Sequence, residues 1–261
     1  MKPDYKNWVP VSMVAGFFAG SAVCLCLAIV FFCIGKLTVF KILGAVFCTA
    51  TIGLLIAGIW MLALNRMFSY DGKRKMSKQI IDGIAEYVNI PDGGTGLDVG
   101  CGSAALSIAA AKRNPNAKIV GADIWSGAYK TVFSKELCEK NAAAEGVKNT
   151  EFREGNALNL PFEDESFDAV FSNYVYHNIP SRDRQSILLE TLRTLKKGGT
   201  FAIHDIFSKS KYGDMQLFVK KLRDMGYEDV SLIDTTAGKF MTKKEAMWME
   251  LSGSAILTGK K

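Results

Sequence analysis

Residues 97–106 read LDVGCGSAAL, an apolar run that ends in an Asp-x-Gly-x-Gly turn and then opens a helix. Because glycine has no Cβ, Gly100 and Gly102 let the backbone turn sharply off a strand and let a ligand approach the main chain. The N–H groups at the start of the new helix then face that ligand. The turn is typical of α/β proteins that hold an adenosine cofactor, but Gly100-x-Gly102-x-x-Ala105 equally fits the dinucleotide fingerprint. The rest of the chain has to decide between the two.

Strand and helix patterns alternate on both sides of this turn. Strands are expected over residues 95–100, 118–123, 150–154, 168–173 and 200–206, with two final strands at 227–234 and 252–258. Helices are expected over residues 80–88, 103–113, 129–145, 182–196 and 213–225. Alternation with short connections predicts a parallel sheet that is covered by helices on both faces.

Two long apolar runs precede this region. Residues 11–34 and 42–64 carry no formal charge, and a short loop with Lys36 and Lys41 separates them. Each run exceeds the roughly 20 apolar residues that cross a bilayer core of about 30 Å. Buried core helices and a cleaved signal peptide are the alternatives. Core helices seldom lack charge on every face for so long, and the apolar stretch of a signal peptide is shorter. We therefore expect a transmembrane helical hairpin that binds the lipid bilayer through both runs.

Basic residues around these runs predict their orientation. The loop between the runs carries two lysines, whereas the outer flanks carry Lys2, Lys6, Arg66, Lys73, Arg74, Lys75 and Lys78. The positive-inside tendency puts both flanks in the cytoplasm. The sequence thus predicts an integral, multi-pass membrane protein whose remaining domain is cytoplasmic.

Small residues recur at every fourth position of the first run, namely Ser12, Gly16, Gly20, Cys24 and Ala28. Such a stripe lets a second helix approach closely. It predicts either the seam of the hairpin or a contact between copies of the chain, which would make a homo-oligomer through the first span.

Charge and cysteine usage argue against other classes of protein. The net charge of +6 comes from basic residues spread along the chain, without an arginine-rich block, so nucleic acid is not expected as a partner. The six cysteines form no C-x-x-C pair. We therefore predict neither a metal site nor a disulfide framework.

Later motifs give the alternating region a family resemblance. They are Asp123 at the end of the second strand, EGNA at 154–157, LPFEDESFD at 160–168, LKKGG at 195–199 and LRDMGY at 222–227. With the glycine turn, they make residues 75–261 resemble the class I S-adenosylmethionine-dependent methyltransferases. The resemblance implies an α/β, Rossmann-like sheet of seven strands with an antiparallel last strand. It also implies S-adenosylmethionine as cofactor and transfer of its methyl group.

The resemblance further implies a set of cofactor-binding residues, which are Asp98, Gly100, Cys101, Gly102, Asp123, Ile124, Trp125, Asn156, Ala157 and Asn173. The Asp123 carboxylate would accept both ribose hydroxyls. Trp125 would lie on the adenine ring or, alternatively, pack in the core. Two positions depart from the family pattern. Ala104 replaces a third glycine and would slightly crowd the cofactor, while Asn156 replaces an aspartate and would accept from the adenine amino group without a charge.

Both histidines of the chain fall beyond the carboxyl ends of strands, where this architecture places its active site. His177 follows the fourth strand, and His204 with Asp205 closes the fifth. A phenol or enol loses a proton when it attacks a methyl group, so these three residues are the candidate catalytic residues. Helix capping or packing is the alternative for His177, and packing against the covering helices is the alternative for His204.

The predicted organisation is a two-span hairpin over residues 1–66, a linker with a lid helix over 67–94 and a methyltransferase domain over 95–261. An anchor concentrates the active site near molecules that partition into the bilayer, so a small-molecule or lipid acceptor is expected. Two alternatives stay open at this point. One is a membrane-tethered S-adenosylmethionine-binding sensor or scaffold without turnover, and the other is a nicotinamide-dependent oxidoreductase.

Overall fold

The computed structural model describes residues 2–125 and 132–261. They form two compact units, one of residues 6–77 and one that joins the N-terminal residues up to Tyr5 with residues 78–261. The domain boundaries predicted after residues 66 and 94 stay predictions.

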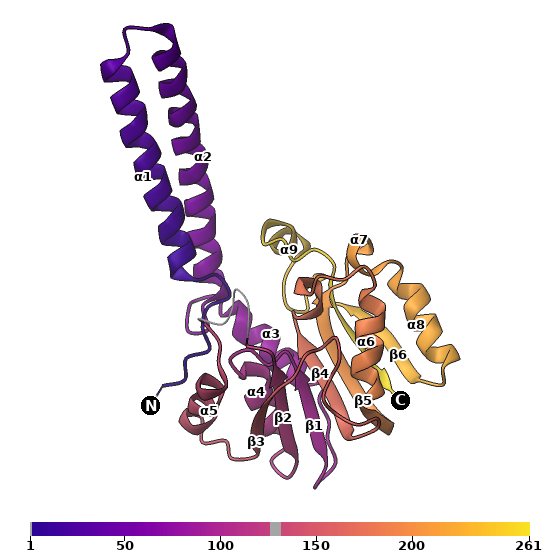
Figure 1. Ribbon diagram of the computed structural model, residues 1–261. Helices are drawn as coiled ribbons and strands as arrows, with labels where there is room; N and C mark the ends of the chain where they lie inside the picture. Colours follow the sequence, from indigo (N-terminus) through magenta and orange to yellow (C-terminus); the bar gives the residue numbers. More distant parts are fainter. Residues whose placement is uncertain (1, 126–131) are drawn as a thin grey trace. The chain divides into compact units, whose positions relative to one another are not determined.

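The smaller unit is a helical hairpin of α1 (Val11–Ile34) and α2 (Thr38–Phe68), which lie side by side (Figure 1). Both helices are long and apolar enough to cross a membrane. Helix α2 extends beyond the predicted run 42–64 at both ends. The apolar run 42–64 is the part of α2 whose side chains suit the hydrocarbon core. The helix itself is longer, because its backbone hydrogen bonds continue through the polar residues at both ends.

Buried residues on the two helices recur every seven positions. The series is Val14, Ser21 and Ala28 on α1 and Gly44, Thr51 and Gly58 on α2, and α2 also buries Leu64 and Phe68 outside this spacing. The Ser21 hydroxyl donates to the Thr51 carbonyl oxygen at 3.1 Å. An added Cβ at Gly58 would lie 3.3 Å from the Phe18 ring, so glycine there lets α1 approach closely. Spacing by seven is typical of long helices that pack along their whole length.

The seam of the hairpin therefore follows only part of the predicted stripe of small residues, since a Cβ at Gly20 would lie 3.5 Å from Leu54 of α2. Ala28 is buried, but Ser12 and Gly16 are exposed. An added Cβ at Gly16 would meet nothing within 4 Å among the described residues. A period of four drifts around the helix, whereas a period near 3.5 stays on one face. A contact between copies of the chain through the stripe stays a prediction.

Seven strands form one sheet in the larger unit, in the order β3-β2-β1-β4-β5-β7-β6. Their bounds are β1 (Thr95–Val99), β2 (Lys118–Asp123), β3 (Thr150–Glu154), β4 (Phe167–Asn173), β5 (Leu195–Ile206), β6 (Glu228–Asp234) and β7 (Ser254–Lys260). Strands β1 to β5 pair in parallel, and β7 runs antiparallel between β5 and β6. The predicted Rossmann-like sheet with an antiparallel last strand is confirmed.

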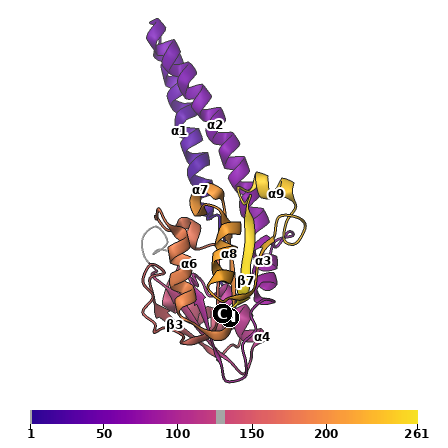
Figure 2. The ribbon, with the colours of Figure 1, turned by 90° about the vertical axis from the view of Figure 1, so that its right-hand side faces the viewer.

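Helices cover both faces of this sheet. They are α3 (Met76–Ala85), α4 (Ala105–Arg113), α5 (Lys135–Ala144), α6 (Arg184–Arg193), α7 (Lys209–Tyr212), α8 (Met215–Asp224) and α9 (Lys243–Trp248), with a 3-10 turn η2 (Tyr176–Asn178). Figure 2 shows α3 and α4 on one face and α6 and α8 on the other. Of the helix predicted over 129–145, residues 129–131 lie outside the described residues. Helices α7 and α9 were not predicted, because they are too short to carry a periodic pattern.

Strand β5 begins at Leu195 rather than at the predicted residue 200, so it includes the LKKGG motif at 195–199. Leu195 pairs with Phe167 across a register shift in β4, and its side chain is fully buried. The Lys196 ammonium lies 2.9 Å from the Asp168 carboxylate, which ties the extended segment to β4. The helix predicted over 182–196 accordingly ends at Arg193.

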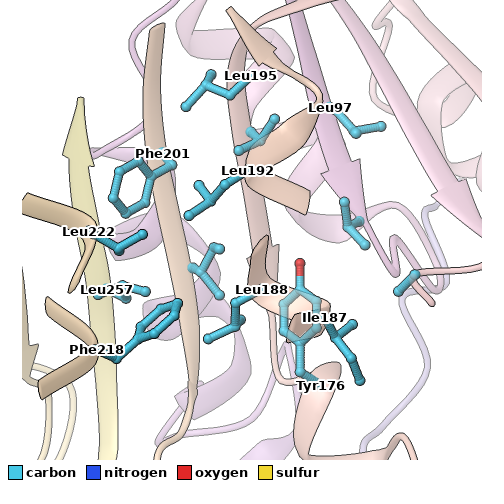
Figure 3. Packing of buried hydrophobic residues seen from close by; sticks show 14 of the residues in the cluster. Leu97, Tyr176, Ile187, Leu188, Leu192, Leu195, Phe201, Phe218, Leu222 and Leu257 are labelled. Carbon is cyan, nitrogen blue, oxygen red and sulfur yellow. The ribbon is translucent and has the colours of Figure 1, made fainter. Parts of the chain in front are cut away.

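Aromatic and aliphatic side chains fill the space between the sheet and helices α6 and α8 (Figure 3). Leu188 and Leu192 of α6 and Phe218 and Leu222 of α8 are almost completely buried, as is Phe201 of β5. Each such side chain contributes roughly 1.5–3 kcal/mol by leaving water. This packing fixes β4 and β5, whose carboxyl ends carry the candidate catalytic residues.

Candidate active site

The loop between β1 and α4 takes the predicted sharp turn. Gly100, Gly102 and Ala104 have φ angles of +73°, +55° and +67°. The Gly100 N–H donates to the Ala122 carbonyl on β2 at 2.7 Å, which ties the start of the loop to the sheet. In the part of the chain that the structure describes, nothing lies within 4 Å of the place where a Gly102 Cβ would stand. The space beside the Gly102 Cα is therefore open to a ligand, although the Gly102 N–H and carbonyl have partners within the protein.

Ala104 does not crowd this opening. Its side chain is fully buried, so the methyl group points into the fold rather than towards a ligand. The prediction that Ala104 crowds the cofactor is therefore wrong. The Cβ of Ala104 instead costs roughly 1 kcal/mol of conformational free energy, because the residue adopts the left-handed region.

Asp123 holds the glycine loop from the end of β2. Its Oδ2 accepts from the Gly102 N–H and its Oδ1 accepts from the Trp125 N–H, each at 2.9 Å. Each carboxylate oxygen keeps a second lone pair. The same acid can therefore fix the loop and accept two hydroxyls of a ribose.

Asp98 lies on β1 beneath the loop and is 1% exposed. The Ser107 hydroxyl donates to its Oδ2 at 2.6 Å. Burial raises the pKa of the Asp98 carboxyl to about 7, although the Ser107 hydrogen bond opposes the shift. A cationic group placed nearby would favour the ionised carboxylate and release a proton.

A hollow of about 450 Å³ adjoins the ends of β2 and β3, and it is lined by Ile124, Glu154, Gly155, Asn156, Asn159 and Pro161. Ile124 is 45% exposed, and the Asn156 amide oxygen accepts from the Leu158 N–H at 3.0 Å. The Trp125 indole N–H donates to the Gly102 carbonyl at 3.2 Å, so its ring nitrogen faces the loop. The lining of the hollow combines the apolar side chains of Ile124 and Pro161 with the amides of Asn156 and Asn159 and the carboxylate of Glu154.

His177 and Asp205 form a hydrogen-bonded pair beyond β4 and β5. The His177 Nδ1 lies 2.6 Å from Asp205 Oδ1. Asp205 is fully buried, and it also accepts from the N–H groups of Tyr176 at 2.8 Å and Ile206 at 2.6 Å. The His177 side chain keeps 15% exposure. The fixed carboxylate orients the imidazole and leaves its Nε2 for a ligand.

His204 lies on the other side of β5 from this pair. It is fully buried, its Nδ1 lies 2.8 Å from Asn173 Oδ1, and its Nε2 lies 3.1 Å from Thr235 Oγ1. Burial lowers the pKa of His204 to about 3, although Asp205 opposes the shift. Neighbouring residues of a strand point to opposite faces, which separates His204 from Asp205.

Tyr174 packs between the two histidines. Its ring centroid lies 4.5 Å from that of His204 and 5.9 Å from that of His177. Its hydroxyl lies 2.9 Å from the Ser254 hydroxyl. Tyr176 instead points into the core and is fully buried. Tyr174 therefore contacts the His177 ring through its side chain, whereas Tyr176 contacts Asp205 through its main-chain N–H.

Comparison with known proteins identifies the family. Residues 90–252 match the family model that is described as a methyltransferase domain. The chain belongs to this methyltransferase family. With the fold, this membership establishes a methyltransferase that uses S-adenosylmethionine as its cofactor.

Its relatives include demethylmenaquinone methyltransferases of several bacteria. The protein of Geobacillus stearothermophilus is 28% identical over 193 residues, which cover 70% of this chain and 77% of the relative. That of Bacillus licheniformis is 30% identical over 193 residues, which cover 72% and 73%. Most of this chain thus aligns with proteins that are named demethylmenaquinone methyltransferases.

Solved structures share the fold. The cyclase SpnF matches with a TM-score of 0.52 at 20% identity, covering 71% of this chain and 80% of that one. A geranyl diphosphate methyltransferase in complex with GPP and sinefungin matches with a TM-score of 0.52 at 16% identity, covering 77% and 80%. One of these neighbours is a cyclase, so the fold alone does not fix the reaction.

The methyltransferase brings most of the predicted site residues to one edge of its sheet. Asp98, the glycine loop and Asp123 lie together, and His177 meets Asp205. The Cys101 thiol is buried beside Gly121, and burial raises its pKa well above the usual range. Ala157 is buried and Asn173 holds His204. The binding and catalytic roles of these residues stay predictions.

Sequence analysis missed the residues that support the outer side of the loop. The Cys138 thiol of α5 donates to the Gly102 carbonyl at 3.1 Å, and the Asn141 amide donates to the Ser103 carbonyl at 3.0 Å. The Ser103 hydroxyl donates to the carbonyl of Tyr5, which stands 98 positions earlier. Local patterns carry no signal for a contact across such a distance in sequence.

Proposed function

We propose that α1 and α2 anchor this methyltransferase in a membrane and that it methylates a small lipophilic acceptor at the cytoplasmic face. The observation that carries the proposal is the pairing, in one chain, of two apolar helices with a domain related to demethylmenaquinone methyltransferases. Anchoring keeps the site close to molecules that partition into the bilayer. A reduced naphthoquinone with a prenyl tail is the first acceptor to test.

The cofactor half of the site holds the adenosine end and the charged end of the cofactor. The open main chain at Gly102 faces the cofactor, and Asp123 accepts from the ribose hydroxyls. Ile124 and Asn156 bound the adenine, and Asp98 stabilises the cationic amino-acid end. When bound, S-adenosylmethionine supplies an electrophilic methyl group on a sulfonium for in-line displacement.

The acceptor half moves a proton. His177 Nε2 accepts the proton of the acceptor hydroxyl as the acceptor becomes nucleophilic. Asp205 accepts a hydrogen bond from His177 Nδ1–H and stabilises the imidazolium that forms. His204 stays neutral and positions Asn173 at the end of β4. It is a positioning residue in this scheme rather than a base.

Full-length protein in nanodiscs tests the proposal with methyl-labelled S-adenosylmethionine and a prenylated naphthohydroquinone. We expect label in the lipid fraction, and we expect Asp98→Ala to abolish it. Asp224→Ala is the matched control, because Asp224 is exposed at the far end of α8. Label confined to protein or water-soluble compounds would contradict a lipophilic acceptor. Cofactor binding without label in any fraction would support a tethered binding protein.

A second experiment tests the orientation of the anchor. The loop between α1 and α2 contains Leu37, which is exposed. We expect a cysteine placed by Leu37→Cys to react with a thiol reagent that does not cross membranes only when the reagent is added outside cells. Reaction in inverted vesicles alone would contradict the proposed orientation.

A further inference from the structure

The N-terminal residues ahead of the membrane anchor are bound to the cofactor half of the site. The Asp4 N–H donates to the Asn141 side-chain oxygen at 2.7 Å, and the Asn141 amide donates back to the Asp4 carbonyl at 3.0 Å. Asn141 is 2% exposed. The same amide donates to the Ser103 carbonyl in the glycine loop at 3.0 Å. One side chain of α5 therefore links the N-terminal segment to the loop.

Tyr5 makes a second link. Its carbonyl accepts from the Ser103 hydroxyl at 2.9 Å, and its own hydroxyl donates to Glu145 at 3.0 Å. Glu145 is also paired with Lys112 of α4. The Tyr5 side chain is 7% exposed. Residue 5 is thus attached both to the loop and to the helix that follows β2.

The glycine loop requires such support. Ala104 has a φ of +67° although it carries a Cβ. Residues in sparsely populated regions cost on the order of 1–3 kcal/mol, and they persist where the surroundings fix them. Ser103, the residue before Ala104, is held through its carbonyl by Asn141 and through its hydroxyl by Tyr5. These two contacts keep the loop in the turn that opens Gly102 to a ligand.

We propose that Asp4 and Tyr5 form a strap that positions the glycine loop, so that cofactor affinity depends on residues outside the matched methyltransferase domain. The inference rests on the proposed role of the glycine loop in cofactor binding. The strap touches Ser103 and α5 rather than the open side of the loop, so these are positioning residues. The strap raises the fraction of protein molecules whose glycine loop is in the conformation that binds the cofactor.

A positioning role of the strap can be distinguished from simple packing, because coupling between two sites is reciprocal. If the strap strengthens cofactor binding by some factor, bound cofactor stabilises the docked strap by the same factor. The Asp4 N–H donates to Asn141, so its hydrogen exchange reports whether the strap is docked. Packing without coupling would leave this exchange unchanged when cofactor binds.

The experiment uses full-length protein in nanodiscs and S-adenosylhomocysteine as the probe. Calorimetry should give a Kd that is about 5–50-fold weaker for Tyr5→Ala and for Asn141→Ala than for wild type. The KM for S-adenosylmethionine should rise in step, while kcat at saturating cofactor should stay within about twofold. In wild type, the probe should slow hydrogen exchange in a peptide that contains residues 4 and 5.

Matched controls remove the effect of lost stability. Tyr227, which directly precedes β6, is buried to a similar extent as Tyr5. The Asn149 amide, like that of Asn141, donates to main-chain carbonyls, here those of Ala111, Asn114 and Ala117. We expect Tyr227→Ala and Asn149→Ala to lower the melting temperature without changing the Kd. Equal Kd values for strap variants and wild type, or unchanged exchange at residues 4 and 5, would overturn the strap. Wild type that fails to bind the probe would instead overturn the proposed cofactor site.

Discussion

The two halves of the site are built in different ways. The proposed cofactor half, around Gly100 and Gly102, is a backbone turn whose shape is held by hydrogen bonds to β2 and Asp123. The acceptor half, around His177 and Asp205, presents side chains whose positions follow from the direction in which each residue leaves a strand. One half therefore depends on a local backbone turn, whereas the other depends on side chains that separate strands bring together.

The two acids of the site show the same contrast. Asp98 makes a hydrogen bond with Ser107, and burial raises its pKa to about 7. Asp205 is equally buried, but it accepts from the main-chain N–H groups of Tyr176, His177 and Ile206 and lies in hydrogen-bond contact with the His177 ring. An acid with few donors changes its charge when a cation arrives, and an acid with many donors holds its partner in place.

The largest effect is expected from His177→Asn. Loss of a general base lowers kcat by about 10²- to 10⁴-fold for an acceptor that has to lose a proton. Cofactor affinity should stay unchanged, because His177 belongs to the acceptor half. Steady-state kinetics and calorimetry measure the two quantities, with Asn178→Ala as a neighbouring control. Unchanged turnover at saturating cofactor would end the assignment of His177 as base.

Asp98→Asn should act on the cofactor half. We expect S-adenosylmethionine to bind about 10–100-fold more weakly at pH 8, because a charged hydrogen-bonding partner is lost. In wild type the affinity should fall as the pH drops below about 7, since binding a cation then requires Asp98 to release its proton. The variant should lack this dependence. Calorimetry in buffers of different ionisation enthalpy would detect the released proton.

The same variant should gain stability. The pKa of Asp98 is raised from 3.8 in the unfolded chain to about 7 in the folded protein, so ionisation destabilises the fold as the pH rises through this window. At pH 8, Asp98→Asn should therefore raise the free energy of unfolding by roughly 1–3 kcal/mol. At pH 5 the gain should be smaller. A variant that is less stable than wild type at pH 8 would contradict the burial of an ionised carboxylate.

A smaller effect is expected from Asn156→Asp. The side chain lies at the rim of the hollow of about 450 Å³, where a carboxylate accepts a hydrogen bond more strongly than an amide. We expect cofactor affinity to increase by about 2–5-fold, in keeping with one exposed hydrogen bond. Leu158→Ala, at an exposed neighbouring position, is the control. If Asn156→Asp fails to tighten binding, Asn156 does not contact adenine.

The smallest effect on chemistry is expected from His204→Gln. His204 is fully buried, and burial lowers its pKa to about 3, so its imidazole is uncharged at neutral pH. The variant should lose roughly 1–2 kcal/mol of stability with its hydrogen bonds. Its pH–rate profile should match that of wild type. A shifted profile would show that His204 takes part in proton transfer.

These contrasts explain what the sequence could and could not predict. Strand β2 was predicted at its observed bounds, because an apolar run between turn residues fixes a buried parallel strand. The segment at Leu195 was not, since a bulge and a contact with β4 extend the strand. In the hairpin, the pattern predicted the helices but not the buried face. That face depends on which side of α1 meets α2.

The site shows a similar limit. The spacing of glycines and Asp123 predicts the cofactor half, because backbone turns have local signatures. His177 and Asp205 were both candidates, but their meeting depends on the tertiary fold. Which of two adjacent residues on β5 faces His177 depends on the phase of the strand, and the sequence did not fix it. Tyr5 was missed because its contact with Ser103 spans 98 positions.

A comparison of Asp98→Asn with His177→Asn in nanodiscs separates cofactor binding from methyl transfer. One calorimetric titration with S-adenosylhomocysteine and one single-turnover reaction with a labelled methyl group and a prenylated naphthohydroquinone are run on each preparation. We predict that Asp98→Asn weakens binding while saturating cofactor restores most of the methyl transfer. We predict that His177→Asn binds normally and transfers the methyl group slowly at any cofactor concentration. Loss of binding and of transfer together in both variants would contradict a division of the site into two halves.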